Sequence, residues 1–312
     1  MKQLSLAVII GIYFSFNLNA QSTSFKYYTL SNAFKNSLFY IKCLSDSVAR
    51  STDDSTKLFA NAKLRDTLPG LLCVETTFED PFDSIKSISI IKSNDEHVRI
   101  YTWFVATENA TKYHYEGVIQ FRDKGDKLFK VISLRDSTYE DDLVIKKLLK
   151  KGNWYGAMYY NIVEVRKNGN TLYTLIGWKG YDKNVTKKVI DIVKFTRGEP
   201  TFGAAVLQNK KKIQSRLIFS YSSAVSMKLN YDSKKKMIVY EHLSAPDGTE
   251  NAAPEVMGPD MTYDGLKWRD EKWMYFKDLE MKNNSTESDK KDKPDKKEKK
   301  LYTPASEEGE KK

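Results

Sequence analysis

Long stretches of this chain alternate apolar and polar residues, and this period of two limits the fold more than any other feature. In "VRIYTWFV", Val98 and Ile100 fall on one face of an extended strand, while Arg99 falls on the other. Alternation of this kind is typical of strands that bury one face. The pattern recurs through residues 81–136 and again through residues 153–282. We therefore expect largely antiparallel β-sheet in both regions.

Polar connectors separate these runs at lengths suited to hairpins. Within residues 81–136 the connectors "NDE" and "DKGDK" predict an antiparallel meander with one buried face. In the second region, "KNGN" at residues 167–170 predicts a turn. The segment "RDEK" at residues 269–272 predicts a hairpin tip, across which Trp268 and Trp273 would pair.

Two segments depart from this alternation and predict helices. Within residues 21–80, apolar side chains recur at helical spacing from residue 27 to residue 50. The segment "STDDST" then offers caps for a second helix, which Pro69-Gly70 would interrupt or end. Residues 137–152 predict a connecting helix, with acids in the first turn and lysines in the last. The expected fold class is α+β, with the N-terminal helical segment packed on the sheets.

The two ends of the chain predict export and a tail. Residues 1–20 begin with Lys2, continue as an apolar run and end on Ala20, which is the pattern of a secretory signal peptide. The run is shorter than the ~20 residues of a membrane-spanning helix, so we expect no membrane span in the mature chain. Residues 283–312 are mostly lysines and acids and predict a disordered tail. The expected location is periplasmic or extracellular, with outer-membrane association left open.

The chain is basic, with 51 Lys and Arg against 41 Asp and Glu and a net charge of +10. Lysines and acids nearly balance in the tail, so the excess belongs to the folded body. A positive body favours anionic partners, although a solvated lysine-rich surface is the plainer explanation. The expected partner is an envelope protein or an anionic glycan, and no nucleic acid is expected.

The two cysteines, Cys43 and Cys73, raise the question of a disulfide. An exported protein reaches an oxidising compartment, where such a pair forms readily. The bond would close a loop of about 30 residues and stabilise the fold by at most roughly 3 to 4 kcal/mol. Two buried free thiols are the alternative.

The sequence contains none of the common catalytic or metal-binding spacings. There is no HExxH, no paired CxxC, no phosphate-binding loop and no GxSxG. The three histidines, His97, His114 and His242, stand apart from one another. These absences favour a non-enzyme and indicate no enzyme class.

One candidate binding site lies in the segment "GWKGYD". Trp178, Tyr181 and Asp182 fall there in an expected exposed turn. Aromatic side chains at such tips often contact sugars or proteins. The alternative is that these rings fold back and pack on the edge of a sheet.

A second candidate site lies in the acidic loop after His242. Asp247, Asp260 and Asp264 offer hard oxygen ligands of the kind that hold calcium, which is the one cofactor considered. A pair of these carboxylates would also suit acid catalysis, as in a glycan hydrolase. The prolines and glycines of the same segment are explained by a loop alone, and Asp264-Gly265 suits a turn.

Three segments resemble parts of uncharacterised secreted proteins of Bacteroidota-type bacteria: "NWYGAMYYNIV", "YTLIGWKGYDKNVTKKVIDIV" and "GPDMTYDGLKW". The resemblance covers roughly residues 80–280 and implies a bacterial envelope setting, but it implies no activity and no site residue. The leading hypothesis is a non-enzymatic envelope protein that binds a partner or a glycan. The alternative is a carboxylate-based hydrolase of the envelope, with or without calcium.

Overall fold

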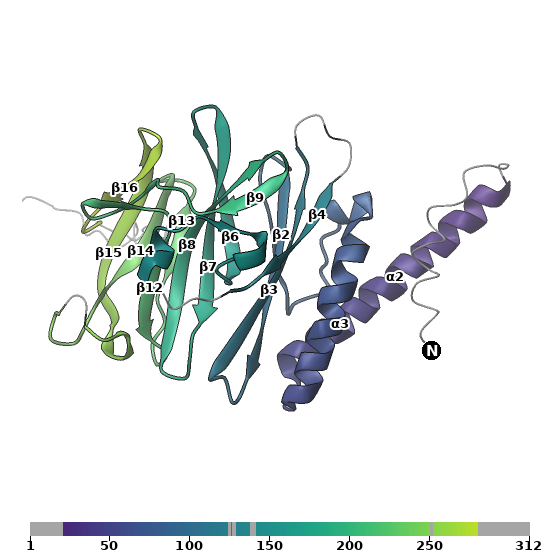
Figure 1. Cartoon of the computed structure of the whole chain (residues 1–312), viewed down its shortest axis with the longest axis horizontal. Helices are drawn as coiled ribbons and strands as arrows, with labels where there is room; N and C mark the ends of the chain where they lie inside the picture. The colour runs from purple at the N-terminus through teal and green to yellow at the C-terminus, as the bar shows by residue number, and fades with distance from the viewer. Residues whose placement is uncertain (1–20, 124–125, 127–128, 138–141, 250–251, 280–312) are drawn as a thin grey trace, which may run out of the picture. The chain divides into compact units, whose positions relative to one another are not determined.

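The computed structural model describes residues 21–123, 126, 129–137, 142–249 and 252–279 (Figure 1). The fold is α+β, with two N-terminal helices followed by three β-sheets in which antiparallel pairing predominates. The elements form four successive layers, the helices first and the three sheets after them. The predicted signal peptide and the whole predicted tail lie outside the described residues. No helix within the described ranges is long and apolar enough to cross a membrane.

The first layer is a helical hairpin made of α2 (Gln21–Arg50) and α3 (Asp54–Leu72). Asp53 caps α3 as the sequence predicts, because its carboxylate accepts a 2.7 Å bond from the amide of Thr56. The expectation that Pro69 would interrupt or end this helix is wrong. The helix continues to Leu72 because the turn that contains Leu71 and Leu72 is buried, and the apolar contacts made there outweigh the hydrogen bond that proline removes.

The first sheet is a meander whose four strands pair antiparallel in chain order. Tyr101 and Trp103 point to the helices and are buried there, whereas Ile100 and Ile119 point to the next sheet. Both faces are therefore buried, and the expectation of one buried face is wrong. The strands are β1 (Ser89–Lys92), β2 (Val98–Thr107), β3 (Lys112–Phe121) and β4 (Lys130–Arg135).

The central sheet lies between the other two sheets and is buried on both faces. Leu175 and Val193 face the first sheet, while Ile176, Ile190 and Ile192 face the third. The short strands β9 and β12 pair with the two ends of the same long strand, β8. The strands are β5 (Leu149–Lys150), β6 (Met158–Lys167), β7 (Asn170–Gly180), β8 (Val185–Thr196), β9 (Glu199–Phe202) and β12 (Leu217–Ser222).

The last two strands of the third sheet along the chain form the hairpin that the sequence predicts. Asp270 and Glu271 form its tip with φ angles of 49° and 57°, as a tight two-residue turn requires. Trp268 pairs with Trp273 across the strands, with ring centroids 5.6 Å apart. Asp264-Gly265, expected at a turn, lies inside a strand instead. The strands are β10 (Leu207–Asn209), β11 (Lys212–Gln214), β13 (Leu229–Asp232), β14 (Met237–Ser244), β15 (Gly258–Arg269) and β16 (Lys272–Phe276).

The connecting helix predicted for residues 137–152 is wrong where the structure describes that segment. Two 3-10 turns, Asp142–Ile145 and Lys151–Asn153, flank the short strand β5. The segment forms its backbone pairings with distant parts of the chain and not within a helix of its own. Its strand β5 pairs with β9, and Trp154 forms a bridge with Asp136. These tertiary pairings satisfy the backbone groups that a helix would have satisfied.

The predicted disulfide is absent from the structure. Cys43 and Cys73 are both free and exposed, so the alternative of two buried thiols is wrong as well. The two cysteines lie at different heights on the helical hairpin. At 1.5 Å of rise per residue, Cys43 is about 10 Å from the helix connection and Cys73 about 28 Å.

Candidate functional site

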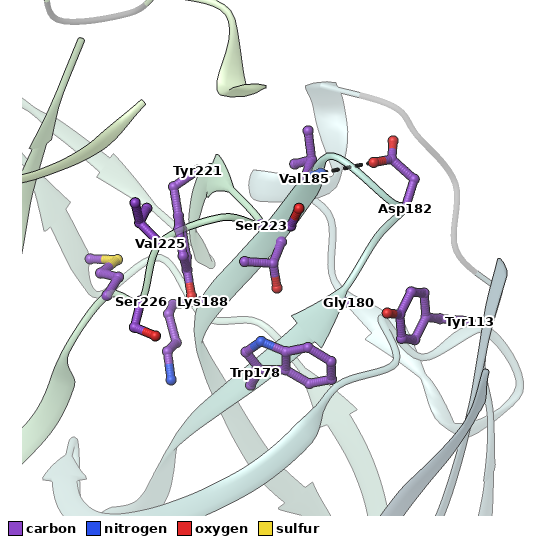
Figure 2. Close-up of a pocket in the computed structure, with 12 residues that line it drawn as sticks. Tyr113, Trp178, Gly180, Asp182, Val185, Lys188, Tyr221, Ser223, Val225 and Ser226 are labelled. Carbon is purple, nitrogen blue, oxygen red and sulfur yellow. Dashed lines mark hydrogen bonds between the residues drawn. The ribbon is translucent and has the colours of Figure 1, made fainter. Parts of the chain in front are cut away.

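A pocket of about 330 Å³ lies where β7 ends and β8 begins (Figure 2). Residues from three parts of the chain meet there: β3, the β7–β8 connection and the segment that follows β12. Its walls combine aromatic, charged and hydroxyl side chains. Among them are Tyr113, Trp178, Asp182, Lys188, Tyr221 and Ser226.

Trp178 and Tyr113 form the aromatic side of the pocket. Their ring centroids are 6.0 Å apart in an edge-to-face arrangement, and the ring of Phe104 packs against Trp178 with a centroid distance of 5.3 Å. Gly180 permits this close packing. A Cβ atom at Gly180 would lie 2.5 Å from the ring of Tyr113 and 2.8 Å from that of Trp178. The aromatic wall therefore depends on glycine at this position.

Lys188 places a cation in the same pocket. It is the cross-strand neighbour of Trp178. Its Nζ atom donates a 3.3 Å bond to the hydroxyl of Tyr160 and lies 4.6 Å from the centre of that ring. Within the described part of the chain, no carboxylate lies within ion-pair distance of Lys188. Burial lowers its pKa, as expected for a half-buried cation without a counter-charge.

Asp182 places a carboxylate at the opposite end of the pocket. Its Oδ1 atom accepts bonds from the amides of Asn184 at 2.7 Å and Val185 at 2.8 Å, and so it shapes the turn (Figure 2). Tyr113 lies near this charge. Its pKa is raised, first by burial and then by the negative charge of Asp182. The hydroxyl of Tyr113 consequently stays protonated and is a donor at neutral pH.

The segment after β12 closes the remaining side. Tyr221 is buried at the end of β12, and Val225 and Met227 add apolar surface. Ser223 is held by a 2.6 Å bond from its hydroxyl to the carbonyl of Lys183. The pocket is thus partly apolar and carries a small number of fixed polar groups, which is the usual composition of a small-molecule site.

Two of the three residues predicted in "GWKGYD" line this pocket. Trp178 and Asp182 are in its walls, whereas Tyr181 lines a neighbouring hollow, with the Nζ of Lys187 3.7 Å from its ring centre. Sequence reasoning missed Lys188 and Tyr113. The sequence does contain a signal for Lys188. Residues two apart on a strand share a face, so Lys188 falls on the same apolar face as Ile190.

The three aspartates of the predicted calcium site have different surroundings in the structure, and the calcium site stays a prediction. Among the described residues, no group of three or more metal-ligating side chains could hold an ion. Asp247 is exposed and accepts a bond from the amide of Thr249, and Asp260 likewise accepts from Thr262. Each of these carboxylates therefore stabilises the backbone beside it, Asp247 in a loop and Asp260 near the irregular part of β15.

Asp264 has a different environment, because it is buried between strands. It accepts hydrogen bonds from the hydroxyl of Tyr275 at 2.9 Å and from the amide of Asp278 at 3.2 Å. Its Oδ2 atom also lies 2.8 Å from Nδ1 of His242. These contacts join β14, β15, β16 and the segment that follows β16. They give Asp264 a structural explanation that needs no ligand.

Comparison with known proteins adds no relative from which a role could be transferred. No family model, no curated protein and no solved structure matches this chain. The function of the pocket has to follow from its chemistry. It offers two aromatic faces, one cation without a counter-charge and one carboxylate.

Proposed function

We propose that the protein is a non-enzymatic binding protein of the cell envelope, and that its pocket holds an acidic sugar unit of an anionic glycan. The observation that carries this proposal is Lys188, a half-buried cation with no carboxylate near it in the described chain. Keeping a charge away from water costs free energy unless an opposite charge offsets the cost. An anionic group on a ligand supplies that charge.

The other walls suit the rest of a sugar. Trp178 and Tyr113 offer flat apolar faces against which the C–H groups of a sugar ring pack. Asp182 accepts hydrogen bonds from sugar hydroxyls at the end away from the cation. A neutral sugar would use these groups but would leave Lys188 uncompensated, so the pocket favours an acidic one.

The envelope location rests on the first twenty residues. Their basic start, short apolar run and Ala20 have the form of a signal peptide. Sequencing the N-terminus of the protein purified from its own cells tests this part. A mature chain that starts near Gln21 supports export, and a retained Lys2 together with a cytoplasmic fraction contradicts it.

Binding is tested on an array that pairs anionic glycans with neutral glycans of the same length. We expect the wild-type protein to bind uronate-containing or sulfated glycans, and Lys188→Met to lose at least tenfold in affinity, about 1.4 kcal/mol. Lys194→Met is the matched control, because Lys194 lies on the same strand outside the pocket. Equal binding by both variants, or binding of neutral glycans alone, would overturn the proposal.

A further inference from the structure

The pocket is one of two adjoining hollows that share an aromatic wall. The second hollow measures about 200 Å³ and is lined by residues from the start of β3 and the end of β7. Tyr113 and Gly180 belong to both linings. The ring of Tyr113 therefore stands between two concave surfaces. We propose that the ligand is a linear acidic oligosaccharide whose neighbouring units occupy the two hollows on either side of Tyr113.

The second hollow also combines an aromatic ring with nearby cations. Tyr181 supplies an aromatic face, and the Nζ of Lys187 lies 3.7 Å from the centre of its ring. Such a contact keeps positive charge beside the ring. Lys112 and His114 from β3 line it as well, with the Nζ of Lys112 in an ion pair with Glu108 at 2.6 Å. Aromatic rings and cations thus occur in both hollows, which matches a polymer that repeats one acidic unit.

The position of Gly180 links the two hollows structurally. A Cβ atom there would come within 2.8 Å of both Trp178, in the first hollow, and Tyr113, which divides the hollows. Any side chain at this position would shift the shared wall and so change both sites together. A ligand that fills only the first hollow does not reach Tyr181, which lines the second.

This inference depends on the proposed function, since it assigns the length of the glycan that the pocket takes. Binding two linked units makes the second contact intramolecular, so affinity rises when a chain reaches the second hollow. A third or fourth unit beyond the two hollows should add little. The chain-length dependence of the affinity therefore reports the number of subsites.

The test is calorimetric titration with galacturonic acid and its linear oligomers of two, three and four units. We expect the dimer to bind roughly tenfold more tightly than the monomer, and the trimer and tetramer to match the dimer. Tyr181→Ala should remove that gain while leaving monomer binding unchanged. Tyr263→Ala is the control, because Tyr263 is a partly exposed tyrosine on β15, outside both hollows.

The possible outcomes separate the two proposals. If the monomer and the longer chains bind with equal affinity, the two-subsite inference is wrong and the acidic-sugar pocket stands. If no member of the series binds and no anionic glycan on the array binds, both proposals are wrong. If Tyr181→Ala keeps the full gain with length, a second subsite lies elsewhere and the hollow beside Tyr181 is excluded.

Discussion

Lys188 is the single residue on which the functional account depends most. A charge held partly away from water destabilises the fold in the absence of ligand, and here the hydroxyl and ring of Tyr160 contact the ammonium but no carboxylate of the described chain neutralises it. A protein that served only as a scaffold would gain by replacing this lysine with an apolar side chain of similar length. A ligand that supplies the missing negative charge would offset the free-energy cost of keeping Lys188 partly buried.

Lys188→Met should leave the free energy of unfolding unchanged or raise it. Burial lowers the folded-state pKa of Lys188 below the usual 10.5, so between these two values the unfolded chain binds more protons than the folded one. The free energy of unfolding of the wild type should therefore increase as pH rises through that window. Lys188→Met should not show this increase. Urea unfolding from pH 7 to 11 measures the difference, with Lys194→Met as control. A clear loss of stability in Lys188→Met at pH 7 would contradict this reading.

Arg216 and Asp191 show the opposite case, a buried cation that has its partner. An Nη atom of Arg216 lies 2.7 Å from Oδ2 of Asp191, and both side chains are fully buried. Arg216→Met should cost about 3 to 5 kcal/mol, because it leaves a carboxylate buried and unpaired. Burial raises the pKa of Asp191 and Arg216 opposes this rise. The loss should therefore shrink as pH falls and Asp191 takes up a proton.

Urea unfolding of Arg216→Met at pH 7 and pH 4 provides that measurement. The double variant Arg216→Met with Asp191→Asn is the comparison, and it should recover part of the loss because no charge remains buried. A single variant as stable as the wild type would show that the pair does not matter to the fold.

At the scale of elements, the two tryptophans of the β15–β16 hairpin differ in burial and should contribute differently to the free energy of unfolding. Trp273 is buried, and its indole N–H donates a 2.9 Å bond to the hydroxyl of Thr174 on the central sheet. Trp268 is only partly buried and packs against Trp273. Trp273→Ala should cost about 3 to 5 kcal/mol and Trp268→Ala about 0.5 to 1.5 kcal/mol. Equal losses on urea unfolding would contradict these roles.

The helical hairpin makes a prediction about its cysteines. Because Cys43 and Cys73 are exposed and far apart along the helices, both should react with a maleimide reagent in the native protein without reductant. Mass spectrometry of the labelled protein should show two adducts. A chain that labels only after reduction would restore the disulfide and require a different arrangement of α2 and α3.

The sequence predicted elements well where local chemistry decides them. The tip at Asp270 and Glu271 and the cap at Asp53 follow from turn and capping rules that need only a few neighbouring residues. The connecting helix failed because residues distant in sequence decide that segment. Its strand β5 pairs with β9, and no local pattern contains that pairing.

The candidate site was only half predictable for the same reason. Trp178 and Asp182 stand four residues apart, so one short motif pointed to both. Tyr113 comes from a separate sheet and reaches the pocket only through the packing of that sheet on the central one. Lys188 was visible as a lysine on an apolar face, but the absence of a counter-charge appears only in three dimensions.

At the scale of the whole described fold, the stacked layers explain why the sequence suggested less burial than exists. Alternation within one strand predicts a single buried face, and a second buried face appears when another layer covers it. Tyr101 and Trp103 look like an outer face in the sequence, and α2 and α3 cover them. The central sheet is covered on both sides, so its exposed ends are where a pocket can form, and the pocket beside Trp178 lies at one of them.

The pH dependence of the affinity for trigalacturonate tests most directly whether Lys188 holds an acidic sugar. The carboxylates of this ligand stay ionised from pH 7 to 11, so a change in affinity reports the protein. We predict that wild-type affinity falls as pH rises through the lowered pKa of Lys188, before an ordinary lysine would lose its proton. Lys188→Met should bind weakly and without this dependence. The same affinity and pH profile in both proteins would contradict the claim.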